Sequence, residues 1–512
     1  MSGTTTTHSS HGDVHAQRLF FCSCIALIST SVAFAVIGDI MGTLKTTFVL
    51  TNAQVGQIGG AALWGFTLSI IALGPLCDAL GMRTLLRFAW LCHLAGPLLM
   101  MVATGFWSLF AGALILALGN GTVEAACNPL VATLFPNRKT QMLNRFHVWF
   151  PGGIVIGGLL CFAFSQLGLS SYKLRLMLIL IPTLTYGILF LGQTFPVTER
   201  VRSGVSFSGM IRATLGRPLF LILFLCMGIT ASLELGPNRW IPAILEAGGM
   251  HGILVLVWIS GLMAVLRFFA GPIVHRLSPT GMLVVSAVLS GAGLFWLSYA
   301  ETMTMALVSA TVFALGVCYF WPTMLGVVSE RVPKGGALAL ALMGGMGMLA
   351  SGMLASPWLG RIADTNLPDR LDGPGSIAVL ERVVDVYTPL AAAAQEPFKS
   401  EIQAAIDDAS AILNQTGSDK PLPAGTANAL RHAVAASASA PGSTEVAAVV
   451  TMVKSVLNPA DNYGGRMAFR RLAPVSGIII LVFGTLYIID RRRGGYKVVH
   501  LAEADGSPTA HI

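Results

Sequence analysis

The sequence predicts an all-α integral membrane protein with twelve transmembrane helices in two six-helix halves. Two observations lead to this class. Only 11% of the 512 residues are charged and 54% are hydrophobic, whereas charged residues make up roughly 25% of an ordinary soluble domain. Apolar runs of about 20 residues, the length needed to cross a hydrocarbon core, also recur along the chain. A soluble fold of this size cannot hide so much apolar surface, and the composition also excludes a disordered chain.

Twelve apolar runs define the expected spans. All must be helices, because backbone groups that face lipid need partners within their own segment. In the first half, residues 19–195, the runs cover 19–44, 55–76, 85–103, 107–130, 146–164 and 176–195. In the second half, residues 219–489, they cover 219–244, 252–274, 282–300, 303–328, 336–359 and 472–489. An arginine-rich central loop, 196–218, separates the halves, and the tails are 1–18 and 490–512.

Lys and Arg near the span ends predict the orientation. With the N-terminus in the cytoplasm, most of these residues, including the central loop and 491–493, fall on the cytoplasmic side. We therefore expect a multi-pass protein of the cell (plasma or inner) membrane with both tails and the central loop in the cytoplasm. The first span has no small-residue cleavage pattern, so it is expected to be a retained helix. Topology accounts for the net charge of +8, and no nucleic-acid partner is expected, because no basic tract is interleaved with aromatics.

Residues 365–468 form an insert before the last span, on the predicted extracytoplasmic side. It is Ala-rich and acidic overall, and helical periodicity places Ile402, Ile406 and Ala409 on one face and Val446 and Val449 on another. Two interpretations stay open, a helical cap that contacts a substrate or partner and a tolerated loop insertion; the second is favoured. All eight cysteines lie in or beside spans, which excludes a disulfide-stapled outer domain.

A short motif recurs after the second span of each half. Residues 74–83 read GPLCDALGMR, and residues 271–277 read GPIVHRL. Repeated six-helix halves with a substrate site at their interface are a common transporter architecture. The first copy resembles the loop signature of the major facilitator superfamily, although Ala79 stands where that family usually has Arg and His275 stands where Asp is expected. The resemblance implies a cytoplasmic gate held by charge pairing, with Asp78, Arg83 and Arg276 as the gate residues.

Ionisable residues inside the spans are the next candidates, because each costs roughly 2.5–3.5 kcal/mol at the bilayer centre and is therefore a functional candidate by default. They are Asp39, His93, Glu124, His147, Glu234, Arg239 and Arg267. Buried carboxylates whose charge depends on their neighbours suit proton coupling, since protonation and substrate binding then affect the same site.

The fourth span carries the most informative stretch, residues 119–129, GNGTVEAACNP. Glu124 and Asn128 are four residues apart and share a helix face. The small residues around them let neighbouring helices approach closely. A dinucleotide-binding loop is rejected, because no strand precedes the glycines and the third glycine is missing.

This stretch resembles the fucose–proton symporter family, a sugar-transporting branch of the major facilitators. The similar segments are 119–129, the LNRFH run at 143–147 before a Gly-rich fifth span, Gly38-Asp39, Glu234 with Trp240, and the FWPT run at 320–323. The resemblance covers the twelve spans and leaves out the insert. It implies roles in proton coupling and sugar binding for Asp39 and Glu124. Gly38 stands where that family commonly has Asn, so the particular sugar is not determined.

Further substrate-binding residues implied by the resemblance are Asn128, His147 and Glu234, and aromatic stacking on a sugar adds Trp240 and Trp321. Arg239 either serves the substrate or pairs with Glu234; the two readings stay open. Arg267 is expected to anchor a helix end toward the cytoplasm. Asp39 and Glu124 are expected to differ in depth by roughly 15 Å at about 1.5 Å per helical residue, and so to act as separate stations.

The predicted function is a monomeric secondary active transporter that moves a hexose or deoxyhexose by alternating access in symport with protons. It needs no cofactor or metal, and sodium stays an alternative coupling ion. The competing hypotheses are a proton-coupled exporter of drugs or metabolites and a non-transporting membrane receptor. An enzyme is not expected, because no nucleophile–base, zinc or phosphate-loop pattern occurs.

Overall fold

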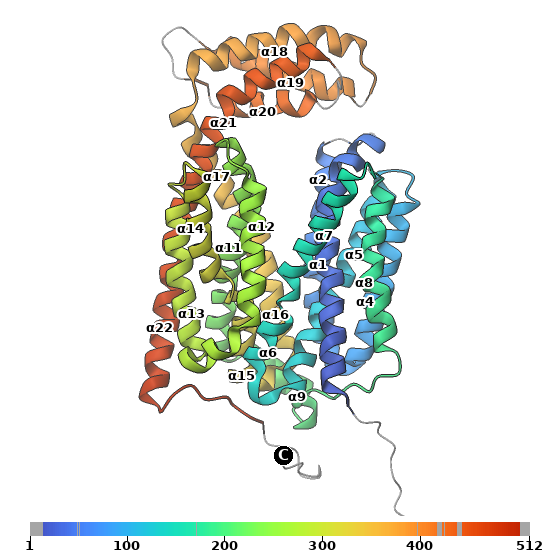
Figure 1. The fold of residues 1–512 in the computed structure, drawn as a ribbon, viewed down its shortest axis with the longest axis vertical. Helices are drawn as coiled ribbons and strands as arrows, with labels where there is room; N and C mark the ends of the chain where they lie inside the picture. Colours follow the sequence, from blue (N-terminus) through green and yellow to red (C-terminus); the bar gives the residue numbers. More distant parts are fainter. Residues whose placement is uncertain are drawn as a thin grey trace, which may run out of the picture.

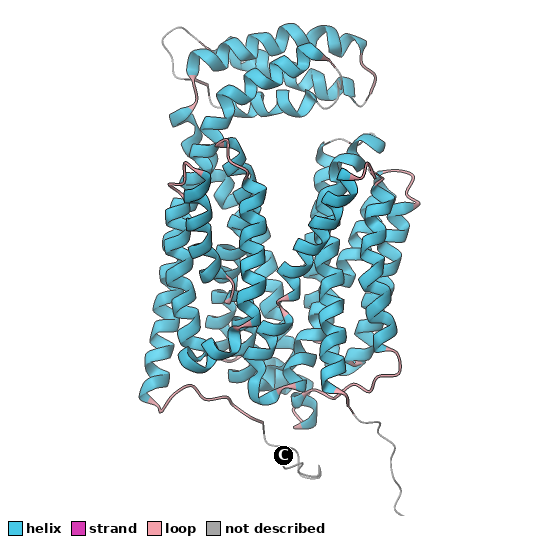
Figure 2. Ribbon diagram, in the orientation of Figure 1, coloured by secondary structure: helices cyan, strands magenta, loops and turns pink. Residues whose placement is uncertain are grey.

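The computed structural model describes residues 14–48, 50, 52–169, 171–396, 398–416, 422–423, 425–437 and 443–501. Most of the N-terminal tail, the C-terminal tail beyond 501, and the breaks expected at Pro421, Pro441 and Gly442 lie outside the described residues. Throughout the described chain the secondary structure is helical, joined by short loops (Figure 2).

Six long helices form the first half: α1 (Ala16–Thr47), α2 (Asn52–Leu73), α4 (Met82–Met101), α5 (Phe106–Leu134), α7 (Trp149–Gln166) and α8 (Tyr172–Phe190). The short helices α3 (Cys77–Leu80) and α6 (Lys139–Phe146) occupy the turns between them. Gly81 ends α3 with φ +81°, a left-handed conformation that glycine adopts without strain. This is the geometric role of the last glycine in the repeated motif.

The second half contains α11 (Pro218–Ala247), α12 (Gly252–Phe268), α13 (Ala270–Leu297), α14 (Met303–Val317), α15 (Phe320–Arg331), α16 (Gly336–Leu349), α17 (Ser356–Asn366) and α22 (Ser476–Arg492). A π-helical turn, Ala350–Ala355, joins α16 to α17. The small helices α9 (Glu199–Arg202) and α10 (Phe207–Leu215) lie in the central loop. Several expected boundaries differ from the helix ends; for example, α12 ends at Phe268 instead of 274, and α22 begins at Ser476 instead of 472.

Within the described residues, ten helical segments are long and apolar enough to cross a membrane. Two shorter apolar helices, Gln57–Leu73 and Gly252–Phe268, lie where the second and eighth spans were expected. The structure is therefore an all-helical membrane protein, and the number of twelve spans stays a prediction.

The two halves form separate bundles that approach each other at one end and diverge toward the other (Figure 1). We call the end where α1 begins and α22 ends the terminal face, and the opposite end, under the insert, the insert face. Near the terminal face α6 packs against α15, α7 against α12, and α2 and α5 against α16. The terminal face is the predicted cytoplasmic side.

Small residues let the helices within each half pack closely. A Cβ added to Gly121 of α5 would lie 2.2 Å from the Phe66 carbonyl oxygen of α2, and one added to Gly293 of α13 would lie 2.3 Å from the Phe313 nitrogen of α14. Lipid-embedded helices gain little from the hydrophobic effect and associate through such close backbone contact.

The insert is a four-helix unit with its own core, made of α18 (Gly373–Ala393), α19 (Phe398–Gln415), α20 (Thr426–Ser437) and α21 (Thr444–Leu472). The residues expected to share a face on α19 and on α21 are buried in that core. The unit lies over the insert face (Figure 1), and α21 leads through a short 3-10 turn into α22. The Asn462 amide donates to the Ile244 carbonyl across 2.7 Å, and Arg431 pairs with Asp364 at 2.8 Å; both contacts attach the insert to the second half.

Candidate functional site

Three of the predicted residues meet on the inner side of the first half. The Asn128 amide donates to Glu124 Oε2 across 2.6 Å, and His147 Nε2–H donates to Asn128 Oδ1 across 3.1 Å. His147 Nε2 also lies 3.8 Å from Glu124 Oε2. The four-residue spacing on α5 stacks Glu124 on Asn128, and the end of α6 brings His147 to them. All three side chains are buried, so a change in the charge or orientation of one alters the hydrogen bonds of the other two.

Glu234 and Arg267 form the matching group in the second half. Arg267 Nη2 donates to Glu234 Oε1 across 2.9 Å, and both side chains are buried. Glu234 Oε2 is buried and has no hydrogen-bond partner among the described residues. The choice left open for Glu234 is thereby settled: its partner is Arg267, and not Arg239. Arg267 lies in the last turn of α12, as expected for a residue that anchors a helix end, and its side chain is only 2% exposed.

Arg267 also joins the two halves through backbone carbonyls. Its Nη1 donates to the His147 carbonyl across 3.1 Å, and its Nε donates to the Cys318 carbonyl. In a regular helix these carbonyls would accept from the residues four positions later, which are Pro151 and Pro322. Proline has no N–H, so both carbonyls are left free at the helix breaks between α6 and α7 and between α14 and α15. Arg267 supplies the missing donors from one guanidinium.

The resulting buried polar chain runs Glu124, Asn128, His147, Arg267 and Glu234, from the first half into the second. It places a carboxylate at each end, and its two parts are joined through the His147 residue, whose imidazole bonds to Asn128 and whose backbone carbonyl accepts from Arg267. Among the described residues no group of three or more His, Cys, Asp or Glu is placed to hold a metal ion. The chemistry that this arrangement offers is proton binding and hydrogen bonding.

Asp39 is separate from this chain. Its carboxylate pairs with Arg175 of α8 at 2.9 Å and is about one-third exposed, whereas Glu124 bonds to Asn128. The two carboxylates therefore have different partners and different environments.

The two candidate tryptophans pack within the second half. Trp321 is 8% exposed, and a Cβ added to Gly347 of α16 would lie 2.6 Å from its ring. Trp240 lies against α17, where a Cβ added to Gly360 would be 3.5 Å from its ring. Neither ring lines the central cavity described below, and their sugar-stacking role stays a prediction.

At the terminal face, two residues of the central loop bind the Asp78 carboxylate. Arg200 Nε and Thr198 Oγ1 each donate to the Asp78 carboxylate across 2.6 Å. Arg83 instead donates to the Gln193 carbonyl and stacks on Phe195, 5.7 Å from the ring centre. Asp78 and Arg83 therefore have separate partners, and their role in a gate stays a prediction. Arg276 is exposed and makes no ion pair with any residue that the structure describes.

Further hydrogen bonds join the halves at the terminal face. The Thr140 N–H and hydroxyl both donate to Glu330 Oε1, across 3.0 and 2.9 Å, and the Asn144 amide donates to Thr323 Oγ1 across 3.2 Å. The Lys139 ammonium reaches the Ser329 carbonyl at 3.3 Å. These contacts hold the two bundles together at this end.

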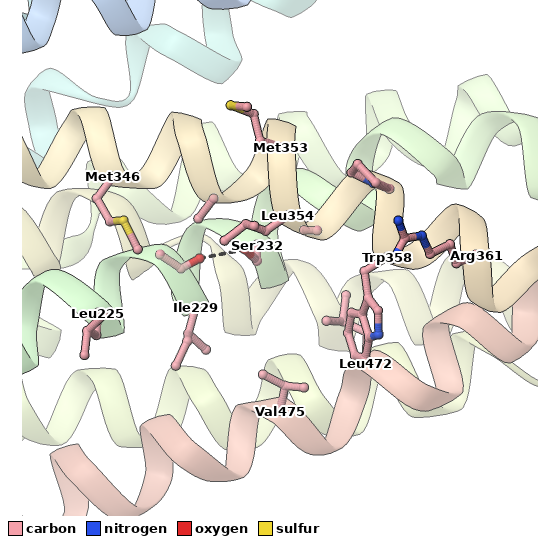
Figure 3. A pocket seen from close by; sticks show the side chains of 14 residues that line it. Leu225, Ile229, Ser232, Met346, Met353, Leu354, Trp358, Arg361, Leu472 and Val475 are labelled. Carbon is pink, nitrogen blue, oxygen red and sulfur yellow. Dashed lines mark hydrogen bonds between the residues drawn. The ribbon is translucent and has the colours of Figure 1, made fainter.

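A central cavity of about 240 Å³ lies between the halves, lined by residues of α1, α2 and α5 together with Arg239 of α11. A larger cavity of about 730 Å³ is built from the second half alone (Figure 3). Several of its lining residues, such as Leu225, Met353 and Leu354, are strongly exposed, as expected for an apolar groove that faces lipid. Of these two cavities among the described residues, the central cavity lies where alternating access places a substrate site.

The contacts that three residues make at these sites were not predicted from the sequence. Arg267 could have been placed from the two prolines, because each frees a carbonyl that needs a donor. Arg200, the partner of Asp78, lies 122 residues away in the central loop, and no local signal identifies it. Asn120, which accepts from His93 Nε2 across 3.0 Å, stands one helical turn before Glu124, a spacing that was visible.

Two helical bundles in contact at one face, a cavity between them and a buried polar chain across their interface define a polytopic transporter. Residues 19–357 match the Major Facilitator Superfamily, about two-thirds of the 512 residues. The chain belongs to this superfamily; it is a secondary transporter and not an enzyme.

Individual relatives are distant. A probable sugar efflux transporter of Haemophilus influenzae is 22% identical over 69% of this chain and 87% of its own length. A 2-nitroimidazole transporter of Escherichia coli is 23% identical over 68% of this chain and 90% of its own length. The crystal structure of FucP in the outward conformation has 19% sequence identity and a TM-score of 0.58, covering 68% of this chain and 92% of FucP. That similarity agrees with the predicted family resemblance and concerns the fold.

Proposed function

We propose that this protein moves a hexose- or deoxyhexose-class sugar across the cell membrane in symport with protons, acting as a monomer with both termini in the cytoplasm. The observation that carries the proposal is the buried polar chain from Glu124 to Glu234, which links a carboxylate in each half through Arg267. The resemblance of residues 119–129 and 143–147 to sugar symporters adds support.

Glu124 is the proposed proton-binding group. An ionised carboxylate only accepts hydrogen bonds, whereas a protonated one also donates. Proton transfer to Glu124 would therefore remove the charge that the Asn128 amide now meets at 2.6 Å. The amide can then reorient, and its carbonyl oxygen, which accepts from His147, changes partner with it. A proton and a substrate that both act on this chain bias the same rearrangement, which is the thermodynamic basis of coupling.

Alternating access requires the terminal-face contacts to break. Opening this face would separate Thr140 from Glu330 and Asn144 from Thr323, and would release the interface between α2 and α16. The Arg267–His147 carbonyl bond also crosses between the halves. A rearrangement at His147 is therefore positioned to weaken the contact between the bundles.

The proposal is tested by uptake into proteoliposomes, with an inward proton gradient and a panel of hexoses, deoxyhexoses, amino sugars and uronic acids. Wild type is expected to accumulate at least one sugar, and Glu124→Gln to lose accumulation. Glu246→Gln is the matched control, because Glu246 is an exposed carboxylate near the insert-face end of α11 and should change nothing. Uptake that Glu124→Gln leaves intact would refute the coupling role.

Two alternatives predict different results in the same assay. The name of one relative, a probable sugar efflux transporter, favours an exporter as the second candidate. Such a protein would drive substrate out of vesicles against the direction of proton entry. A non-transporting receptor would show no movement of any substrate, and Glu124→Gln would then have no effect on its function.

A further inference from the structure

The central cavity has an unusual set of polar groups. Its walls are mostly apolar and include Phe34, Ile37, Met41 and Leu63. The only polar side chains among the lining residues are Asn120 of α5 and Arg239 of α11. The described lining residues include no carboxylate, so they present hydrogen-bond donors and one positive charge.

Arg239 differs from the other arginines at membrane depth. Arg175 pairs with Asp39 and Arg267 pairs with Glu234, whereas Arg239 forms no ion pair and no side-chain hydrogen bond within the described chain. Its side chain is exposed and lines the central cavity. A cation within a membrane span is costly without a counterion, and the residues that the structure describes supply none to Arg239.

Asn120 provides a second donor opposite Arg239. Its Oδ1 is occupied by His93 Nε2–H, and His93 Nδ1 in turn accepts from the Tyr186 hydroxyl across 3.1 Å. This network fixes the orientation of the amide and leaves its Nδ2 group without a partner in the described residues. Arg239 and Asn120 belong to different halves, so a ligand that binds both spans the interface.

From this geometry we infer that the transported substrate carries a carboxylate that binds Arg239 and the Asn120 amide. A guanidinium offers paired N–H donors that match the two oxygens of a carboxylate, and the apolar walls receive the rest of a small molecule. The ligand chemistry is that of a small organic acid, either a sugar acid or an aromatic acid. This inference rests on the proposed transport function and narrows its substrate from a neutral hexose or deoxyhexose to the corresponding sugar acid; binding of the aromatic acid alone would keep transport and replace the sugar.

The site also connects to the proposed proton pathway. Asn120 and Glu124 are four residues apart on α5 and share one face of the helix. A carboxylate held at Asn120 would lie one turn from Glu124. Substrate charge and the protonation of Glu124 would then influence each other directly, because like charges at such separations repel.

Binding to the purified protein in detergent tests the inference without requiring transport. The probes are D-glucuronate against neutral D-glucose, and benzoate against neutral benzamide, titrated by calorimetry. An acid is expected to bind and its neutral counterpart not to bind. Arg239→Gln should weaken acid binding about ten- to a hundred-fold, the range for losing a hydrogen bond to a charged group, and Arg239→Lys should keep part of it.

Arg361→Gln is the control, because Arg361 is exposed and lines the separate apolar groove of Figure 3; it should leave binding unchanged. Equal binding of neutral and acidic probes, unchanged binding by Arg239→Gln, or no binding of either acid would overturn the inference. The two proposals fail separately. Transport of a neutral sugar by Arg239→Gln would leave the proposed function standing, whereas acid binding without proton movement would leave only this inference.

Discussion

Arg267→Met is expected to be one of the most destabilising single substitutions in the membrane domain. It removes the cation from buried Glu234, whose Oε2 already lacks a partner, and it removes the donors to the His147 and Cys318 carbonyls. Breaking one side of a buried ion pair costs about 3–5 kcal/mol. Each buried carbonyl left unsatisfied adds about 1–3 kcal/mol. Partial relaxation makes these terms less than additive, so a loss of about 4–6 kcal/mol in unfolding free energy is expected.

Unfolding in mixed detergent–SDS micelles, followed by far-UV circular dichroism, measures this loss. The double variant Glu234→Leu with Arg267→Met removes both charges and should be more stable than Arg267→Met alone. It should still be less stable than wild type, because the two carbonyls stay unsatisfied. Adding Pro151→Ala to the double variant restores an N–H for the His147 carbonyl and should recover about 1 kcal/mol.

The order of stabilities tests the reasoning more sharply than any single value. The unfolding free energy should be highest for wild type and should decrease from the triple variant to the double variant and then to Arg267→Met. If Arg267→Met lost less than about 1 kcal/mol, or if the double variant were less stable than Arg267→Met, the account of Arg267 as donor to both halves would be wrong.

Three further predictions concern other parts of the molecule. Asp78→Asn loses its ion pair with Arg200 and should open the terminal face, so maleimide labelling of the neighbouring buried Cys77, measured by mass spectrometry, should rise several-fold. Arg83→Gln removes no ion pair with Asp78 and should not raise the labelling. Equal labelling in both variants would contradict the pairing of Asp78 with Arg200. Gly121→Ala places a methyl group 2.2 Å from the Phe66 carbonyl oxygen and should lower the unfolding free energy by about 1–3 kcal/mol, while Gly477→Ala in α22, with open space around it, should be neutral in the same titration. In the insert, burial raises the pKa of Tyr387 to about 12, above its unfolded value of about 10. The stabilisation by the protonated phenol is therefore fully present below pH 10 and is lost as the pH rises toward 12. Circular dichroism should show the insert losing stability over that pH range, and Tyr387→Phe should lose less.

The helical membrane fold was predictable because the physics that determines it is local. A run of apolar residues has to cross the bilayer as a helix wherever its neighbours lie, so composition and run length suffice. The boundaries were less accurate where helices break. The expected span 303–328 is divided at residues 318–319 into α14 and α15, and the signal for this break was Pro322.

The site was predictable in part. Glu124 and Asn128 share a helix face, and their contact follows from spacing alone. His147 joins them through the turn between α6 and α7, which the family resemblance suggested and spacing did not. The partners of Glu234 and Asp78 were missed, because an ion pair between residues 33 or 122 positions apart depends on how whole helices pack. The sequence offered Arg239, Arg267 and Arg83 as candidate cations, and it did not single out Arg200 from the other arginines of the central loop.

The most direct test of the central claim is proton movement itself. Wild-type proteoliposomes that contain a pH-sensitive dye are given substrate from the panel without an imposed gradient, and internal pH is followed. The account predicts substrate-dependent acidification that Glu124→Gln abolishes and Glu246→Gln preserves. Substrate uptake with no change in internal pH, or acidification that persists in Glu124→Gln, would contradict it.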